Sequence, residues 1–186
     1  LAAEDFEITP LAVTVTPDAL SKTYGEVDPL LTYTLSATSS ATLSVVGALS
    51  RASGEDVGDY AIELGTLSNT NYTLTLAPEN FQITPLAVTV TPDNLTKVYG
   101  ELDPVLTYSL RAASSATLTT TGSLTRAAGD DVGDYAIGLG TLTNTNYSLT
   151  LAPENLSITP LAVTVTPDAL TKTYGNSDST LTYSLS

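Results

Sequence analysis

GEDVGDYAI, from Gly54 to Ile62, returns as GDDVGDYAI from Gly129 to Ile137, 75 positions further along the chain. Its order of Asp56, Gly58 and Tyr60, each separated by one residue and followed by an apolar residue, is typical of the tyrosine corner of β-sandwich domains. In such a corner a turn leads into a strand, and the Tyr hydroxyl bonds back to the backbone. We expect Gly58 to allow the turn and the Asp56 side chain to accept backbone N–H bonds there. The stretch therefore predicts an architectural turn, present twice because a whole domain is present twice.

The rest of the chain repeats in the same 75-residue register. LAVTVTPDAL begins at Leu11 and at Leu161, and LAVTVTPDNL begins at Leu86. NTNYTLTLAPEN at Asn69 recurs as NTNYSLTLAPEN at Asn144. Self-similarity at a fixed period of this kind is the signature of a tandem array. We expect four segments within a longer array: the end of a preceding repeat (1–10), a first repeat (11–85), a second repeat (86–160) and the start of a following repeat (161–186).

Composition excludes several classes of function. The 186 residues include 20 acidic and 6 basic ones, for a net charge of −14 at pH 7. This charge disfavours nucleic acid, whose binding relies on Lys and Arg at phosphates, and it disfavours an anionic membrane surface. No apolar run approaches the roughly 18 residues that a membrane-spanning helix needs. With no Cys and no His, the sequence offers no disulfide and no thiolate metal site, and nothing in it calls for a cofactor.

Alternation of apolar and polar residues predicts an all-β fold. Apolar side chains occur at every second position, as Val13 and Val15 do between threonines, and Thr, Val and Tyr favour strands. We expect two tandem small antiparallel β domains, with an immunoglobulin-like sandwich favoured. The alternative is a β-grasp-like sheet that carries a short helix within residues 37–50. The alternating runs lie at 13–16, 31–36, 60–64, 72–76 and 81–84.

The boundary between the two repeats reads FQITPLAVTVTPD, from Phe81 to Asp93. It holds no Gly- or Ser-rich spacer of the kind that makes a flexible linker. Pro85 fixes its own φ and keeps Thr84 extended, and the alternation of side chains continues on both sides. The sequence therefore predicts domains joined end to end in an elongated arrangement.

Three phrases of the first repeat carry a resemblance to a known family: KTYGEVDPLLTY (22–33), GALSRASGEDVGDYAI (47–62) and NYTLTLAPENFQITP (71–85). On these phrases the chain resembles the MBG domain of the YGX type, a family found in tandem in large bacterial surface proteins, including filamentous haemagglutinin-like adhesins. The resemblance covers essentially the whole chain, although the third copy has Asp178-Ser179 in place of the Asp-Pro of the other two. It implies a location outside the bacterial cell and a stalk or adhesive role, and it supplies no catalytic residue.

Two chemical sites are possible alternatives to this architectural interpretation. A carboxylate pair, Glu55 with Asp56 or Asp56 with Asp59, would suit glycosidase chemistry, but we expect solvated turns and no enzyme. The same carboxylates, joined by Asp28 and Glu79 and repeated around Asp131, are the hard oxygen ligands that Ca²⁺ prefers. The D-x-D-x-D-G loop is absent, so surface charge is the expected role and no metal site is predicted.

Lysine and tyrosine positions raise two further possibilities. One Lys occupies the same place in each copy, at Lys22, Lys97 and Lys172. It is a candidate for a crosslink to Asn71 or Asn80, or else a charge that protects an edge strand from pairing. The tyrosines Tyr33, Tyr60 and Tyr72 fall on the apolar side of their strands and are expected in the core. Tyr24, beside Gly25, is the one expected to lie in a loop.

Taken together, the sequence predicts stalk or spacer repeats of a large bacterial surface or secreted adhesin, which hold a distal functional region away from the cell. The alternative is an adhesive module whose repeats contact a glycan or a host protein directly. The expected partners are neighbouring repeats of the same, monomeric chain, because each unit of a repeat array contacts mainly its neighbours. The residues that would bind a ligand are not identified by the sequence.

Overall fold

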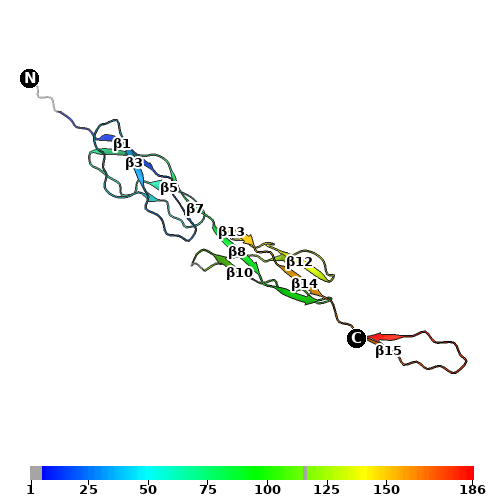
Figure 1. Cartoon of the computed structure of the whole chain (residues 1–186). Coiled ribbons are helices and arrows are strands. Elements are labelled where there is room, and N and C mark those ends of the chain that lie inside the picture. The colour runs from blue at the N-terminus through cyan, green and yellow to red at the C-terminus, as the bar shows by residue number, and fades with distance from the viewer. Residues whose placement is uncertain (1–5, 115–116) are drawn as a thin grey trace, which may run out of the picture. The chain divides into compact units, whose positions relative to one another are not determined.

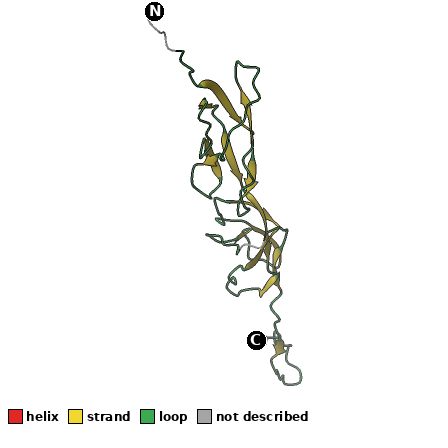
Figure 2. Ribbon diagram, turned by 90° about the vertical axis from the view of Figure 1, so that its left-hand side faces the viewer, coloured by secondary structure: helices red, strands yellow, loops and turns green. Residues whose placement is uncertain are grey.

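The computed structural model describes residues 6–114 and 117–186, and these residues form strands and loops with no helix (Figure 2). The predicted all-β fold is therefore confirmed. The helix of the β-grasp alternative is wrong, because residues 37–50 form bends, one isolated bridge and the first residue of a strand. The strands of the first repeat are β1 (Leu11–Pro17), β2 (Ser21–Thr23), β3 (Tyr33–Ser36), β4 (Ser50–Arg51), β5 (Gly58–Glu63), β6 (Tyr72–Leu76) and β7 (Asn80–Thr84).

The first repeat is a sandwich of two sheets. One sheet has the order β3-β1-β6 and the other β2-β7-β5-β4. Figure 1 labels β1 and β3 of the first sheet and β5 and β7 of the second. Val15 of β1 faces Phe81 and Ile83 of β7, and all three side chains are buried in one core cluster with Leu49, Ile62 and Leu67. The threonines between the valines of β1 are exposed. Period-two alternation thus separates the core from the solvent face, as expected for a half-buried strand.

The sheets are mixed, which corrects the expectation of purely antiparallel pairing. β1 pairs parallel with β6, and β2 pairs parallel with β7, whereas β1 with β3 and β5 with β7 are antiparallel. Parallel neighbours need a long connection, and here several strands intervene along the chain between the partners. Alternation of side chains is the same in both kinds of pair, so the sequence pattern did not distinguish them.

The second repeat contains the same strands 75 positions later. Its sheets have the orders β10-β8-β13 and β11-β12-β14-β9, again with a parallel pair between β14 and β9. The strands of this repeat are β8 (Leu86–Pro92), β9 (Leu95–Val98), β10 (Tyr108–Ala112), β11 (Thr125–Arg126), β12 (Gly133–Gly138), β13 (Tyr147–Leu151) and β14 (Asn155–Thr159).

Two compact units make up the described chain, and their limits differ from those of the repeats. The first unit comprises Leu1–Val90, Leu110–Gly122 and Leu142–Thr150, and so includes the whole first repeat together with most of β8, β10 and β13. The second unit comprises Thr91–Ser109, Ser123–Thr141 and Leu151–Ser186. It holds the four-stranded sheet of the second repeat and the start of the third copy.

The third copy forms only a hairpin. β15 (Val165–Pro167) and β16 (Tyr183–Leu185) pair antiparallel, and their side chains are exposed. Their counterparts in the first repeat, β1 and β3, bury their apolar face against a second sheet, which residues 161–186 do not include. At the position where Asp178-Ser179 replaces Asp-Pro, Asp178 pairs with Lys172.

A repeated corner and ion-pair cluster as the candidate functional site

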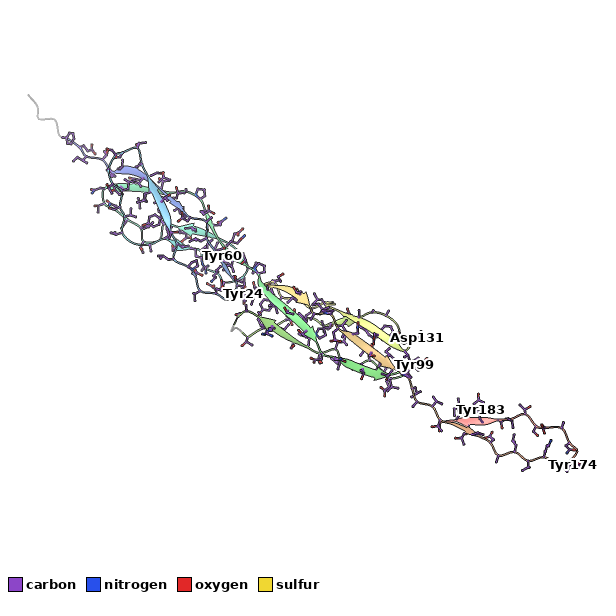
Figure 3. All side chains as sticks on the ribbon, in the orientation of Figure 1. Tyr24, Tyr60, Tyr99, Asp131, Tyr174 and Tyr183 are labelled. Atoms are coloured by element: carbon purple, nitrogen blue, oxygen red, sulfur yellow. The ribbon has the colours of Figure 1, made fainter. Side chains whose placement is uncertain are left out.

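The tyrosine corner is present in both repeats. The Tyr60 hydroxyl donates to the main-chain oxygen of Asp56 at 2.7 Å, and the Tyr135 hydroxyl donates to that of Asp131 at 2.8 Å. Both tyrosines are half-buried where the turn enters its strand, and Tyr60 is labelled in Figure 3. The architectural interpretation of the repeated phrase is thus confirmed, because the hydroxyl ties the turn to the backbone as predicted.

The glycine that this corner requires is Gly54, not Gly58. Gly58 has a φ of 159°, which is close to extended, and a side chain there would meet nothing within 4 Å. Gly54 has a φ of +143°, and a Cβ there would lie 2.2 Å from Cε1 of Tyr60. Gly129 stands in the same relation to Tyr135. The expected role of Gly58 is therefore wrong. The turn does need a glycine, but at position 54, because any Cβ there would collide with the Tyr60 ring.

Arg51, which sequence reasoning missed, connects the corner to the rest of the sheet. Its guanidinium donates to Asp28 at 2.6 and 3.1 Å, to Glu55 at 2.6 Å and to the main-chain oxygen of Gly54 at 2.6 Å. It also lies 5.0 Å from the centre of the Tyr60 ring, within the range of a cation–π interaction. The only signal in the sequence was an Arg at the same register in both repeats, at positions 51 and 126.

Lys22 completes a four-residue cluster with Asp28, Arg51 and Glu55. It lies on the edge strand β2, but its side chain is buried, and its Nζ contacts Asp28 at 2.6 Å and also contacts Glu55. The cluster ties the loop after β2 to the strand β4 and to the turn before β5. Lys22 therefore stabilises the inside of its own repeat, and its charge is not presented at the open edge.

The second repeat has the equivalent cluster of Lys97, Asp103, Arg126 and Asp130, in which the shorter Asp130 takes the place of Glu55. Arg126 binds Asp103 at 2.5 and 3.0 Å and Asp130 at 2.9 Å. Because Asp130 is one methylene shorter than Glu55, it lies 3.8 Å from Lys97 Nζ. Lys97 donates instead to Asp103 at 2.7 Å and to the main-chain oxygen of Glu101 at 3.1 Å.

Electrostatics within the clusters favour the charged forms. The hydrogen bonds from Arg51 and then Lys22 lower the pKa of Asp28 to about 2, and those from Arg126 and Lys97 lower the pKa of Asp103 to about 2. Burial opposes the charge of Lys22, but its hydrogen bonds to Asp28 and Glu55 outweigh burial and raise its pKa. These shifts indicate paired structural charges, whereas general acid catalysis needs a carboxyl whose pKa is raised.

The chemical sites considered from the sequence are not assembled. Glu55 and Asp28 are occupied by Lys22 and Arg51, Asp59 accepts from Gln82 at 3.4 Å, and Glu79 accepts from the Asn80 N–H at 3.1 Å. In residues 6–114 and 117–186, no three His, Asp or Glu side chains come together in a way that could hold a metal ion. Asp56 accepts from the side-chain amide of Asn146 at 2.8 Å, where local backbone N–H groups were expected.

The crosslink between Lys22 and Asn71 or Asn80 is likewise not assembled, since the Lys22 ammonium contacts carboxylates. Amide formation needs a neutral amine, and the raised pKa of Lys22 disfavours this form. Among the tyrosines, Tyr33 and Tyr60 pack against the core of the first repeat, as predicted, and Tyr24 packs there too although it follows β2 in a loop. Tyr99, its counterpart, is 47% exposed.

Fold and cluster together define a class: tandem β-sandwich repeats, each held together by an internal cluster of ion pairs. Comparison with known families gives the family itself. Residues 13–82 and 88–157 each match the MBG domain (YGX type), and the chain belongs to this family. It is a family of structural repeats associated with bacterial surface proteins and is not known for enzymatic activity. No curated protein and no solved structure matches the chain. Among the described residues, no helix has the length and apolarity to cross a membrane.

Proposed function

We propose that these repeats are spacer modules of a larger bacterial cell-surface or secreted adhesin, and that they hold a distal functional region away from the cell. The observation that carries this proposal is the junction. β7 ends at Thr84 and β8 begins at Leu86, so Pro85 alone separates the last strand of one repeat from the first strand of the next. A one-residue connection with fixed φ restricts how far two domains can turn against each other.

The use of charge within each repeat supports the same function. The basic residues Lys22, Arg51, Lys97 and Arg126 are all engaged inside their own repeats, which leaves a surface dominated by carboxylates. A strongly negative surface keeps a long chain soluble and opposes association between copies. The chain therefore acts as a monomer outside the cell, and its partners are the neighbouring repeats of the same chain.

Small-angle X-ray scattering of the 186-residue chain tests the proposal. A spacer should give a radius of gyration well above the roughly 16 Å of a compact chain of this length. A variant with five Gly and Ser residues inserted after Pro85 provides the control and should show a broader distribution of dimensions. A compact radius, or identical distributions for the two chains, would overturn the spacer function.

A second candidate function, direct adhesion to a glycan or a host protein, is favoured by a different observation. The loop after β2 exposes apolar side chains at equivalent positions of both repeats: Val27 and Leu30 in the first, and Leu102 and Val105 in the second. In the second repeat the equivalent loop follows β9, and a hollow beside it is lined by Tyr99, Leu102 and Asp103. Exposed apolar residues that recur in both complete repeats would give an array many weak contacts, although the third copy has Ser177 and Thr180 at these positions.

A glycan array and a panel of extracellular-matrix proteins would test the adhesive function with the intact chain. Binding that is lost when Val27, Leu30, Leu102 and Val105 are all replaced by Ser would support it. The matched control replaces four exposed strand residues, Thr14, Thr16, Thr89 and Thr91, by Ser. Binding by neither protein, or equal binding by both, would reject the apolar loop as an adhesive surface.

A further inference from the structure

Strand register places the tyrosine corner of one repeat beside the start of the next. In the first repeat Gly58 is paired with Ile83, and Thr23 with Thr84, so the corner and Tyr24 both lie at the end of β7 that leads into Pro85. In the second repeat the Leu86 N–H donates to the main-chain oxygen of Asn146 at 3.0 Å. This bond holds Asn146 beside Leu86, the first residue after Pro85.

Three contacts join these two places, and all of them lie within the first compact unit. The Asn146 side chain donates through Nδ2 to Asp56 Oδ1 at 2.8 Å and accepts through Oδ1 from the Val57 N–H at 2.9 Å. The rings of Tyr24 and Tyr147 meet edge to face, with their centres 6.0 Å apart and an angle of 69° between their planes. Edge-to-face packing at this distance is the preferred arrangement of an aromatic pair.

Asn71 is the residue of the first repeat equivalent to Asn146, and comparing the two shows the effect of the contact with Asp56 and Val57. The main-chain N–H of Asn71 donates to Asn69 Oδ1 at 2.9 Å, and the N–H of Asn146 donates to Asn144 Oδ1 at the same distance. Within their own repeats the two residues therefore make the same turn. Asn146 is nevertheless only 9% exposed, whereas Asn71 is exposed. Asn146 is buried against the corner of the first repeat, whereas residues 1–10 do not include a corner that could contact Asn71.

The second repeat carries an equivalent corner that is open. Gly133 is paired with Ile158 and Val98 with Thr159, so Asp131 and Tyr99 lie at the same end of the sheet (Figure 3). Tyr99 is 47% exposed and Val132 is 52% exposed. Neither the Asp131 carboxylate nor the Val132 N–H has a hydrogen-bond partner in residues 6–114 and 117–186.

We infer that each repeat ends in a docking site for the N-T-N-Y turn of the repeat that follows it. The site consists of a carboxylate, the next backbone N–H and a tyrosine. Asp131, Val132 and Tyr99 form the site that receives a following repeat, and Asn71 with Tyr72 is the turn that docks on a preceding one. The partner is thus another repeat of the same family in the same chain, and the inference rests on the spacer function proposed above.

Asparagine suits this role for a chemical reason. Its amide presents a donor and an acceptor in one plane, which match the Asp56 carboxylate and the Val57 N–H at the same time. An aspartate at position 146 would lose the donor and would place a second negative charge against Asp56. The contact therefore discriminates between two side chains of nearly the same shape, and the exposed position 71 provides a matched control.

Amide hydrogen exchange on the intact chain tests the inference. The Val57 N–H should exchange at least about tenfold more slowly than the Val132 N–H. Asn146→Asp should remove this difference, whereas Asn71→Asp should leave it unchanged, with circular dichroism confirming that both variants are folded. Equal exchange at Val57 and Val132 in the unmodified chain, or protection of Val57 that survives Asn146→Asp, would overturn the docking site.

Hydrogen exchange and scattering together distinguish a failure of the docking site from a failure of the spacer function. If scattering shows an extended chain while Val57 is unprotected, the spacer function stands and the docking site falls. If Val57 is protected but the chain scatters as a compact particle, the docking site stands and the spacer function falls.

Discussion

Gly54→Ala tests whether close approach of the Tyr60 ring holds the corner together. An alanine Cβ would lie 2.2 Å from Tyr60 Cε1, whereas carbon atoms normally meet at about 3.5–4.0 Å, so the ring must move by more than about 1 Å. This movement breaks the hydroxyl bond to Asp56, a loss of about 1 kcal/mol, and weakens the stacking of Arg51, a loss of about 0.5–1 kcal/mol. The backbone at a φ of +143° adds about 1–3 kcal/mol of strain, for a total of about 2.5–5 kcal/mol.

Urea denaturation followed by circular dichroism would measure this free energy of unfolding, with the transition of each repeat analysed separately if the two do not coincide. Gly25→Ala is the control, because Gly25 has a φ of +85° but open space around its Cβ position and so adds only backbone strain. Gly129→Ala, which would meet Tyr135 at 2.2 Å, should be destabilised as much as Gly54→Ala. If Gly54→Ala costs no more than Gly25→Ala, the ring contact has no energetic role and the reasoning fails.

Three further outcomes follow from the corner and the clusters. Tyr60→Phe should lower the free energy of unfolding by about 1 kcal/mol in denaturation experiments, and no change would show that the hydroxyl bond contributes nothing. Asp28 and Asp103 have a pKa of about 2 in the folded chain against an ordinary value of 3.8; the stability they contribute is complete above about pH 4 and should be lost as pH falls from there toward 2. Thermal melting against pH would show this loss, and Asp28→Asn with Asp103→Asn should flatten that part of the profile. EDTA and added Ca²⁺ should leave the melting temperature unchanged, because Lys22 and Arg51 already occupy Glu55 and Asp28; a shift with either would reopen the calcium site.

The fold could be predicted to the level at which side-chain alternation carries information. Alternation located β1, β3, β5, β6 and β7, because each of these strands buries one face. It missed β2 and β4, which have three and two residues and are too short for a pattern to emerge. It also left the strand directions open, since parallel and antiparallel neighbours alternate in the same way.

The corner was predictable because its chemistry is local: Tyr60 and Asp56 are four residues apart. The cluster was not predictable, because Asp28 and Arg51 are 23 residues apart and are brought together only by the pairing of the sheet. Counting carboxylates therefore suggested a cation site at Glu55, where folding in fact supplies Arg51 and Lys22 as partners. Asn146 was hidden for the same reason, since its partner Asp56 lies 90 residues earlier.

The central claim, that each repeat adds length to a spacer, is tested most directly by lengthening the chain. One, two and three further copies of residues 86–160, inserted in register after Pro160, would be compared by small-angle X-ray scattering. The account predicts that the maximum dimension rises by the same increment with each added repeat. A radius of gyration that grows only as roughly the 0.38 power of chain length, as in a single compact domain, would contradict it.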